Sequence, residues 1–221
     1  MIADIFNTGR PMPHIALLGD SVFDNISYTQ GAPDVVARLR SALPADWQAT
    51  LCAVDGSTAN DVEPQLQSLA PDTTHLVLSV GGNNALLAVE IVDTPVASTA
   101  EALRLLASVR EEFEAQYVAA VDACLACGIP LTVCTIYNGN FPDVDFNRRA
   151  SIALAVFNDV IVRTALVRSL DVIDLRAVCA TPADFANPLE PSSSGGDKIA
   201  RSIARVLAGN VAWKGARITG L

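Results

Sequence analysis

The chain alternates short apolar runs with longer segments in which apolar residues recur every three or four positions. The apolar runs have the length of strands and cover residues 14–18, 50–54, 75–80, 130–135 and 171–175. They lack in-and-out alternation, which is typical of parallel strands covered on both faces. The segments of helical period are 34–43, 60–69, 98–127, 146–169 and 194–208. This alternation predicts a doubly wound α/β domain with five strands.

Turn residues agree with these boundaries. Pro33 and Asp34 can open the first helix, and Gly128-Ile129-Pro130 ends the third helix and starts a strand. No repeat or linker interrupts the chain, so we expect residues 1–221 to form a single domain. The pattern of the tail from 211 to 221 indicates no secondary structure. Because sheets of this kind bind ligands outside the carboxyl ends of their strands, functional residues are expected in the loops after the strands.

Composition and charge narrow the classes of partner. The 221 residues, 51% of them hydrophobic, are enough to bury a substantial core, and a formal net charge of -9 disfavours binding to nucleic acid. The N-terminus lacks a basic start followed by an apolar run. No later stretch is expected to be long and apolar enough to cross a bilayer. We therefore expect a cytoplasmic protein with no membrane partner.

The cysteines and histidines indicate neither redox chemistry nor a metal. Five cysteines are spread along the chain, which is typical of buried free thiols, and the CxxC pair Cys124 and Cys127 closes a helical segment instead of opening one. The two histidines, His14 and His75, are too far apart in sequence to suggest a coordination set. We expect no cofactor and no metal.

Three loops that follow predicted strands contain small and polar residues suited to acyl transfer. Gly19-Asp20-Ser21 follows the first strand, where a serine in a tight turn can present its hydroxyl beside backbone N–H groups. Asp55-Gly56-Ser57 follows the second strand and Gly81-Gly82-Asn83-Asn84 the third. Each alone is also an ordinary turn. Their common position at the ends of three strands indicates one site.

Four sequence blocks in this order resemble those of the SGNH or GDSL-like hydrolases, a family of esterases, lipases, thioesterases and carbohydrate deacetylases. The blocks are LLGDSVFDN at 17–25, VDGST at 54–58, SVGGNNAL at 79–86 and EPSSSGGDKIA at 190–200. The resemblance implies a flavodoxin-like three-layer αβα sandwich with a five-stranded parallel sheet of order 2-1-3-4-5. It also implies Ser21 as nucleophile, with an oxyanion hole made by the Ser21 and Gly56 N–H groups and the Asn83 side chain.

The last block departs from the family pattern, which has an aspartate, two residues and then a histidine before Pro-Ser. Asn187 stands in the place of the aspartate and Glu190 in the place of the histidine. Asn84 also replaces an aspartate of the third block. His14 and His75 begin predicted strands, and a five-residue strand spans about 17 Å, so neither histidine is expected to reach Ser21.

Glu190 has two interpretations. It could replace histidine as the general base if burial beside Leu189 and Pro188 raises its pKa. It could instead be a solvated loop residue or an ion-pair partner of Lys198 or Arg201, in a protein that has lost catalysis.

Other polar residues could support Glu190. Asn187 would hold Glu190 by hydrogen bonding, and Asp184 or Asp174 could share a proton with it. Four other loop residues are better interpreted as generic loop positions than as part of the pocket: Tyr137, Asn138, Asp24 and Asn25.

The sequence therefore predicts a serine-dependent hydrolase of a small acyl ester that works through an acyl-enzyme. Ser21 is the expected nucleophile, Glu190 the expected base, and Gly56, Asn83 and Asn187 the supporting residues. The alternative is a non-catalytic protein of the same fold that binds a small-molecule ligand. The oligomeric state and the two halves of the ester are not indicated.

Overall fold

The computed structural model describes residues 12–208 and 218–219 of the chain. The described strands form one parallel sheet of order β2-β1-β3-β4-β5-β6. The strands are β1 (His14–Gly19), β2 (Gln48–Leu51), β3 (His75–Ser79), β4 (Leu131–Cys134), β5 (Asp171–Ile173) and β6 (Ile218–Thr219). The predicted α/β fold and the strand order 2-1-3-4-5 are confirmed, and β6 adds a two-residue strand in the tail that carried no prediction.

Five α-helices match the predicted helical segments to within a few residues, and two short α-helices and several 3-10 helices were not predicted. The α-helices are α1 (Val35–Ala42), α2 (Val62–Leu66), α3 (Gly82–Leu87), α4 (Thr99–Ala126), α5 (Val144–Val167), α6 (Leu175–Val178) and α7 (Ser193–Ala208). The 3-10 helices are η1 (Ile26–Tyr28), η2 (Ala59–Asp61), η3 (Val89–Asp93) and η4 (Pro182–Asp184). The largest unpredicted segment is α3 with η3, which fills the chain between β3 and α4.

The second strand, Gln48–Leu51, begins two residues and ends three residues before the expected 50–54. After Leu51 the chain stays beside β1 but leaves regular pairing, because Cys52 and Ala53 both donate their N–H groups to the Leu17 carbonyl oxygen at 2.8 Å. The apolar character of this irregular segment accounts for the shifted boundary.

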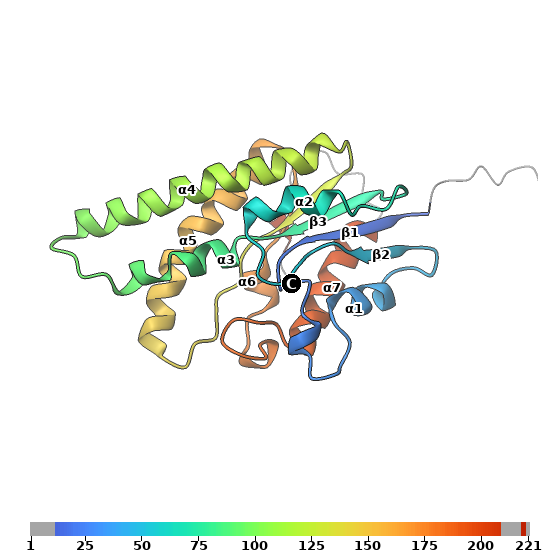
Figure 1. Cartoon of the computed structure of the whole chain (residues 1–221). Coiled ribbons are helices and arrows are strands. Elements are labelled where there is room, and N and C mark those ends of the chain that lie inside the picture. The colour runs from blue at the N-terminus through green and yellow to red at the C-terminus, as the bar shows by residue number, and fades with distance from the viewer. Residues whose placement is uncertain (1–11, 209–217, 220–221) are drawn as a thin grey trace, which may run out of the picture.

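Successive residues of the strands point into two separate cores. From β1, Ile15 and Leu17 pack with α1, α6 and α7 on one face of the sheet, whereas Ala16 and Leu18 pack with α2, α4 and α5 on the other. Figure 1 shows these layers, with α4 and α2 on one side of the strands and α1 and α7 on the opposite side. Because both faces are covered, the strands have continuous apolar sequences.

The sequence was expected to contain no segment long and apolar enough to cross a bilayer. This expectation was wrong, because one helix meets both the length and the composition of such a segment. Helix α5 has 24 residues, and its most apolar window has a mean hydropathy of 1.7, with 33% of that window buried. Core helices of soluble proteins have similar compositions. Part of this apolar surface packs in the core, through Phe157, Val160 and Ile161.

The interpretation of the cysteines as free thiols is confirmed. Cys52, Cys124, Cys134 and Cys179 are buried, Cys127 is exposed, and none of the five forms a disulfide. Burial at the end of α4 raises the pKa of Cys124 to about 12, which makes its thiolate rare at neutral pH.

Candidate active site

The turn after β1 places Ser21 beside the end of β3. Gly19 has φ 124, and a Cβ at this position would lie 1.7 Å from the Ser79 carbonyl oxygen. Only glycine allows this approach, which lets the Asp20 N–H donate to the same Ser79 oxygen at 3.1 Å. Ser21 follows directly and is only 7% exposed.

Gln65, a residue for which the sequence predicted no role, connects this turn to the next loop. Its buried side chain accepts a hydrogen bond from the Gly19 N–H and donates one to the Gly19 carbonyl, both at 2.8 Å. The same amide group donates to the Ser57 hydroxyl at 3.2 Å. A glutamine inside a helical segment has no sequence signal that distinguishes this role from a solvated one.

We expect replacement of Gln65 by leucine to lower the free energy of unfolding by about 2 kcal/mol, because the Gly19 N–H would be left buried without an acceptor. Denaturant unfolding measures this change. Gln67 is exposed at the end of the same helix, so Gln67→Leu is the matched control and should change stability by less than about 0.5 kcal/mol. Equal effects of the two substitutions would contradict this assignment.

Three hydrogen-bond donors proposed for an oxyanion lie at the ends of β1, β2 and β3. Within the described part of the chain, the N–H groups of Ser21 and Gly56 donate to no protein acceptor. Gly56 has φ 84 and is exposed. The Asn83 side chain donates to the Ser57 carbonyl at 2.8 Å, which leaves its second N–H available.

Glu190 and Ser21 come together in one cavity, although 169 positions separate them in the sequence. Burial raises the pKa of Glu190 above its ordinary value of 4.5. The nearby Ser21 side chain lowers this pKa in part, and the charge of Asp55 raises it further. The Oε2 atom of Glu190 is buried and has no hydrogen-bond partner among the described residues.

The ion pairs considered for Glu190 are not formed. Lys198 lies 2.7 Å from the Asp184 carboxylate, and Arg201 lies 2.7 Å from Asp197. Both cations are therefore paired with other acids.

The backbone around Glu190 is held from several sides. The Asn187 side-chain oxygen accepts the Glu190 N–H at 2.9 Å, and Ala186 donates its N–H to the Glu190 backbone carbonyl at 2.8 Å. The Tyr137 hydroxyl donates to the Leu189 carbonyl at 2.6 Å, and the Asn25 side chain donates to the Pro191 carbonyl at 3.4 Å.

These contacts change the interpretation of three residues. The Asn187 side chain accepts hydrogen bonds from the backbone N–H groups of Leu189 and Glu190, so it fixes the turn that carries Glu190 and does not replace an ionic partner of the carboxylate. Asn25 and Tyr137, interpreted from the sequence as generic loop residues, fix this turn as well.

Neither Asp184 nor Asp174 is free to share a proton with Glu190. Burial acts to raise the pKa of Asp184, but Lys198 and Thr181 outweigh it and hold that pKa below the ordinary value. For Asp174, hydrogen bonds from Arg176 and Thr135 likewise outweigh burial and lower the pKa. Both carboxylates therefore stay ionised in local structural contacts.

Asp20 is the second buried acid of the site. It is 3% exposed, and burial raises its pKa from 3.8 to about 7, although the Val22 N–H lowers this pKa in part. The charges of Glu190 and Asp55 also raise it. Asp55 in turn accepts a hydrogen bond from the Tyr28 hydroxyl at 2.7 Å.

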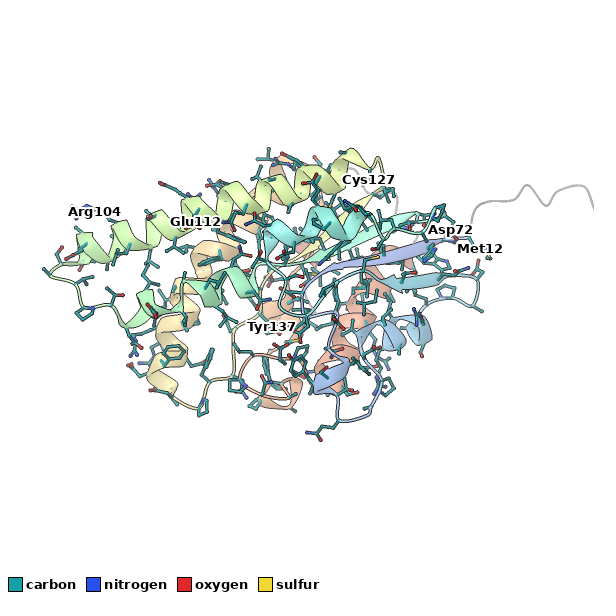
Figure 2. The ribbon with its side chains drawn as sticks, viewed as in Figure 1. Met12, Asp72, Arg104, Glu112, Cys127 and Tyr137 are labelled. Carbon is teal, nitrogen blue, oxygen red and sulfur yellow. The ribbon has the colours of Figure 1, made fainter. Side chains whose placement is uncertain are left out.

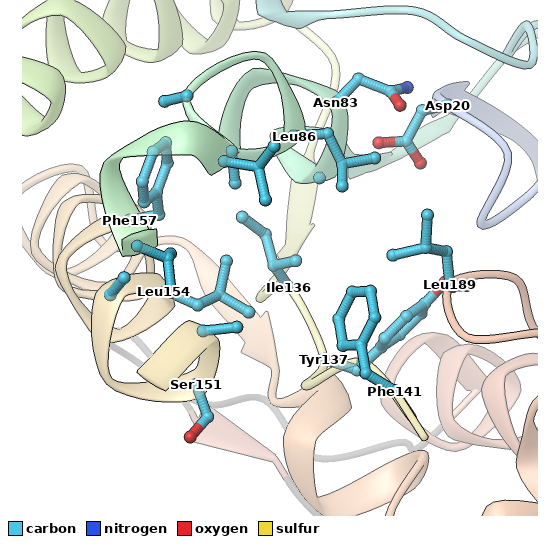
Figure 3. A pocket seen from close by; sticks show the side chains of 18 of the residues that line it. Asp20, Asn83, Leu86, Ile136, Tyr137, Phe141, Ser151, Leu154, Phe157 and Leu189 are labelled. Carbon is cyan, nitrogen blue, oxygen red and sulfur yellow. The ribbon is translucent and has the colours of Figure 1, made fainter. Parts of the chain in front are cut away.

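The cavity continues from Ser21 and Glu190 into an apolar space. Figure 3 shows Asp20 and Asn83 at one end, Ile136 and Leu86 between, and Leu154 at the other end. The empty space between its walls, including the open solvent at its mouth, is about 1010 Å³. The arrangement combines a buried hydroxyl, a carboxylate with a raised pKa, free N–H donors and room for an apolar ligand.

Comparison with known proteins gives the family. Residues 17–196 match the sequence profile of the GDSL-like lipase/acylhydrolase family. The chain belongs to this family. Membership supports a hydrolase, and no curated protein sequence gives a significant match.

Solved structures with the same fold are distant in sequence. An extracellular lipase from Streptomyces rimosus aligns with a TM-score of 0.65 at 17% identity, covering 90% of this chain and 100% of that one. Phospholipase A1 from Streptomyces albidoflavus gives 0.64 at 17%, with 90% and 100% covered. A carbohydrate acetylesterase from Sinorhizobium meliloti gives 0.60 at 11%, again with 90% and 100% covered. At these identities the likeness concerns the fold alone.

In this GDSL-family chain both histidines lie at the other end of the sheet. His14 contacts Asp72 at 2.9 Å and Thr50 at 2.5 Å, and His75 contacts Thr74 at 2.8 Å. Figure 2 shows Asp72 at the end of the strands far from Tyr137. Neither histidine lines the cavity that contains Ser21.

Asn84 has a local reason for replacing the family's aspartate. Its oxygen accepts the Ala59 N–H at 3.0 Å, and its amide donates to Gln116 at 2.7 Å. An aspartate could not donate the second bond. Asn84 thus connects α3 to η2 and α4 by hydrogen bonds, and Asn83 lines the cavity.

Proposed function

We propose that this chain is a serine-dependent ester hydrolase in which Glu190 takes the place of the family's histidine. The observation that carries the proposal is that the Ser21 side chain and Glu190 line the same cavity close enough for Ser21 to lower the pKa of Glu190, a pKa that burial raises. A raised pKa makes a carboxylate a stronger base near neutral pH. Family membership supports the ester-hydrolase class.

In the proposed reaction, the Ser21 oxygen attacks the acyl carbon while its proton passes to Glu190. The negative charge formed on the carbonyl oxygen accepts hydrogen bonds from the Ser21 and Gly56 N–H groups and from Asn83. The carbon–oxygen bond to the alcohol then breaks, and Glu190 returns the proton to the departing alkoxide. Water then attacks the acyl-enzyme while its proton passes to Glu190, the bond from the acyl carbon to the Ser21 oxygen breaks, and Glu190 returns the proton to that oxygen as the acid leaves.

The Asp20 carboxyl is expected to tune this cycle. Two negative charges at close range raise each other's pKa. A protonated Asp20 carries no charge, so it does not raise the pKa of Glu190. Proton loss from Asp20 near pH 7 would therefore push the pKa of Glu190 upward.

A fluorophosphonate probe tests the nucleophile. Intact-protein mass followed by peptide mapping should find one adduct, on Ser21, and none on Ser57, which lies in the adjacent loop. An adduct on Ser57 would contradict the assignment of the nucleophile. No adduct, under conditions that label a known serine hydrolase, would favour the non-catalytic binding protein.

A further inference from the structure

The apolar part of the cavity is built from one face of α5. Phe146, Ala150, Ala153, Leu154 and Phe157 line it. These positions recur at intervals of three and four residues, so they share one side of the helix. From Phe146 to Phe157 the helix advances about 16 Å, which sets the length of the cavity along α5.

The opposite wall comes from α3, η3 and α4. Leu86, Val89 and Ile91 line the cavity from the segment after β3, and Leu106 and Val109 line it from α4. In Figure 1, α3 and the beginning of α4 extend beyond the ends of the strands, away from the sheet.

This wall carries apolar surface that the protein does not cover. Leu86, Val89, Ile91 and Leu106 are only half-buried, and none packs against either hydrophobic core. Apolar side chains that line a cavity and stay partly exposed to water are typical of a surface that a ligand covers.

The polar groups of the cavity are concentrated at its Ser21 end. Asp20, Ser21, Asn83 and Glu190 lie there, and none of the described lining residues is Lys, Arg or His. At the far end the labelled side chains in Figure 3 are Leu154, Phe157 and the single hydroxyl of Ser151. A ligand that fits this distribution has a reactive polar head and an uncharged apolar tail.

We propose that the space between α5 and the segment α3–η3–α4 binds the acyl chain of the substrate, and that this chain is an alkyl chain of about eight or more carbons, which fits the length of the cavity along α5. The proposal rests on the proposed function, because it takes the cavity end at Ser21 as the place of the ester carbonyl. It selects lipid-like acyl esters over acetyl esters and over acids that carry a second charge.

Each methylene that leaves water should strengthen binding about fourfold. We therefore expect kcat/KM for p-nitrophenyl esters to rise by about this factor per carbon from acetate, until the chain fills the cavity, and then to level off. A terminal carboxylate on the acyl chain should abolish the gain, because the cavity offers no cation.

The matched variants are Ala153→Phe, which fills the cavity, and Ala155→Phe, which adds the same side chain at an exposed position of α5. Ala153→Phe should lower the ratio of kcat/KM for decanoate to kcat/KM for acetate at least tenfold. Ala155→Phe should leave this ratio of the two esters unchanged. Binding of 1-decanol, measured by calorimetry, should weaken in Ala153→Phe and not in Ala155→Phe. The calorimetry does not depend on hydrolysis.

The outcomes separate the two proposals. Equal kcat/KM for acetate and decanoate, or an unchanged ratio in Ala153→Phe, would overturn the acyl-chain site and leave the hydrolase proposal standing. Absence of hydrolysis of every ester, with decanol binding that Ala153→Phe weakens, would overturn the proposed function and support the alkyl-binding cavity. Absence of decanol binding would overturn the inference.

Discussion

Replacing Glu190 by glutamine is expected to lower kcat for p-nitrophenyl esters at pH 7 by about 10²- to 10⁴-fold, the usual contribution of a general base. Glutamine has nearly the shape of glutamate and can still bond to Ser21, but it cannot take the proton. KM should change much less than kcat, because the oxyanion donors and the apolar cavity remain. Steady-state kinetics of purified wild type and variant measure both.

Asp46→Asn is the matched control for this substitution, since it neutralises an exposed carboxylate just before β2, at the far end of the sheet. It should leave kcat unchanged. Residual activity in Glu190→Gln is expected, because an oxyanion hole alone accelerates ester hydrolysis. A kcat within about twofold of wild type would mean that Glu190 is not the base.

Replacing Asp20 by asparagine is expected to stabilise the protein by up to about 4 kcal/mol at pH 8 and by almost nothing at pH 4. The pKa of Asp20 is about 7 in the folded protein and near 3.8 when unfolded. Between these values the unfolded chain has lost a proton that the folded chain retains. Folding stability therefore falls as pH rises from 4 to 7, and an uncharged asparagine removes this loss.

Urea unfolding of wild type and Asp20→Asn at pH 4 and pH 8 measures the effect. The Val22 N–H can still donate to the asparagine oxygen, so the turn keeps its hydrogen bond. Asp46→Asn again serves as the control and should give no difference that depends on pH. A stability change of equal size at both pH values would show that the pKa of Asp20 is not raised.

The sheet was predictable because its strands are unusual in composition. Buried on both faces, the segments around Leu17, Leu76 and Val133 are continuous apolar runs, and strand order followed from the family resemblance. Helix α3 and η3 were not predictable in the same way. Leu86, Val89 and Ile91 face the cavity instead of the core, and α3 begins with Gly82 and Asn83, which are typical of a turn.

Some residues of the candidate site could be predicted from the sequence and others could not. Ser21, Gly56 and Asn83 follow directly from local motifs at the ends of strands, and the place of Glu190 from its position before Pro191. Residues that act through buried hydrogen bonds carry no such motif. Gln65 and Asn25 bind groups that are 46 and 166 positions away in the sequence, so only the fold shows their partners.

The most direct test of the account is the rate at which a fluorophosphonate labels Ser21 between pH 4 and 9, in the wild type and in Glu190→Gln. For the wild type we expect the rate to rise about tenfold per pH unit up to a midpoint above 4.5, the ordinary pKa of a glutamate, and then to level off. The variant should react slowly, with no such midpoint. Identical pH profiles for the two proteins would contradict the assignment of Glu190 as the base.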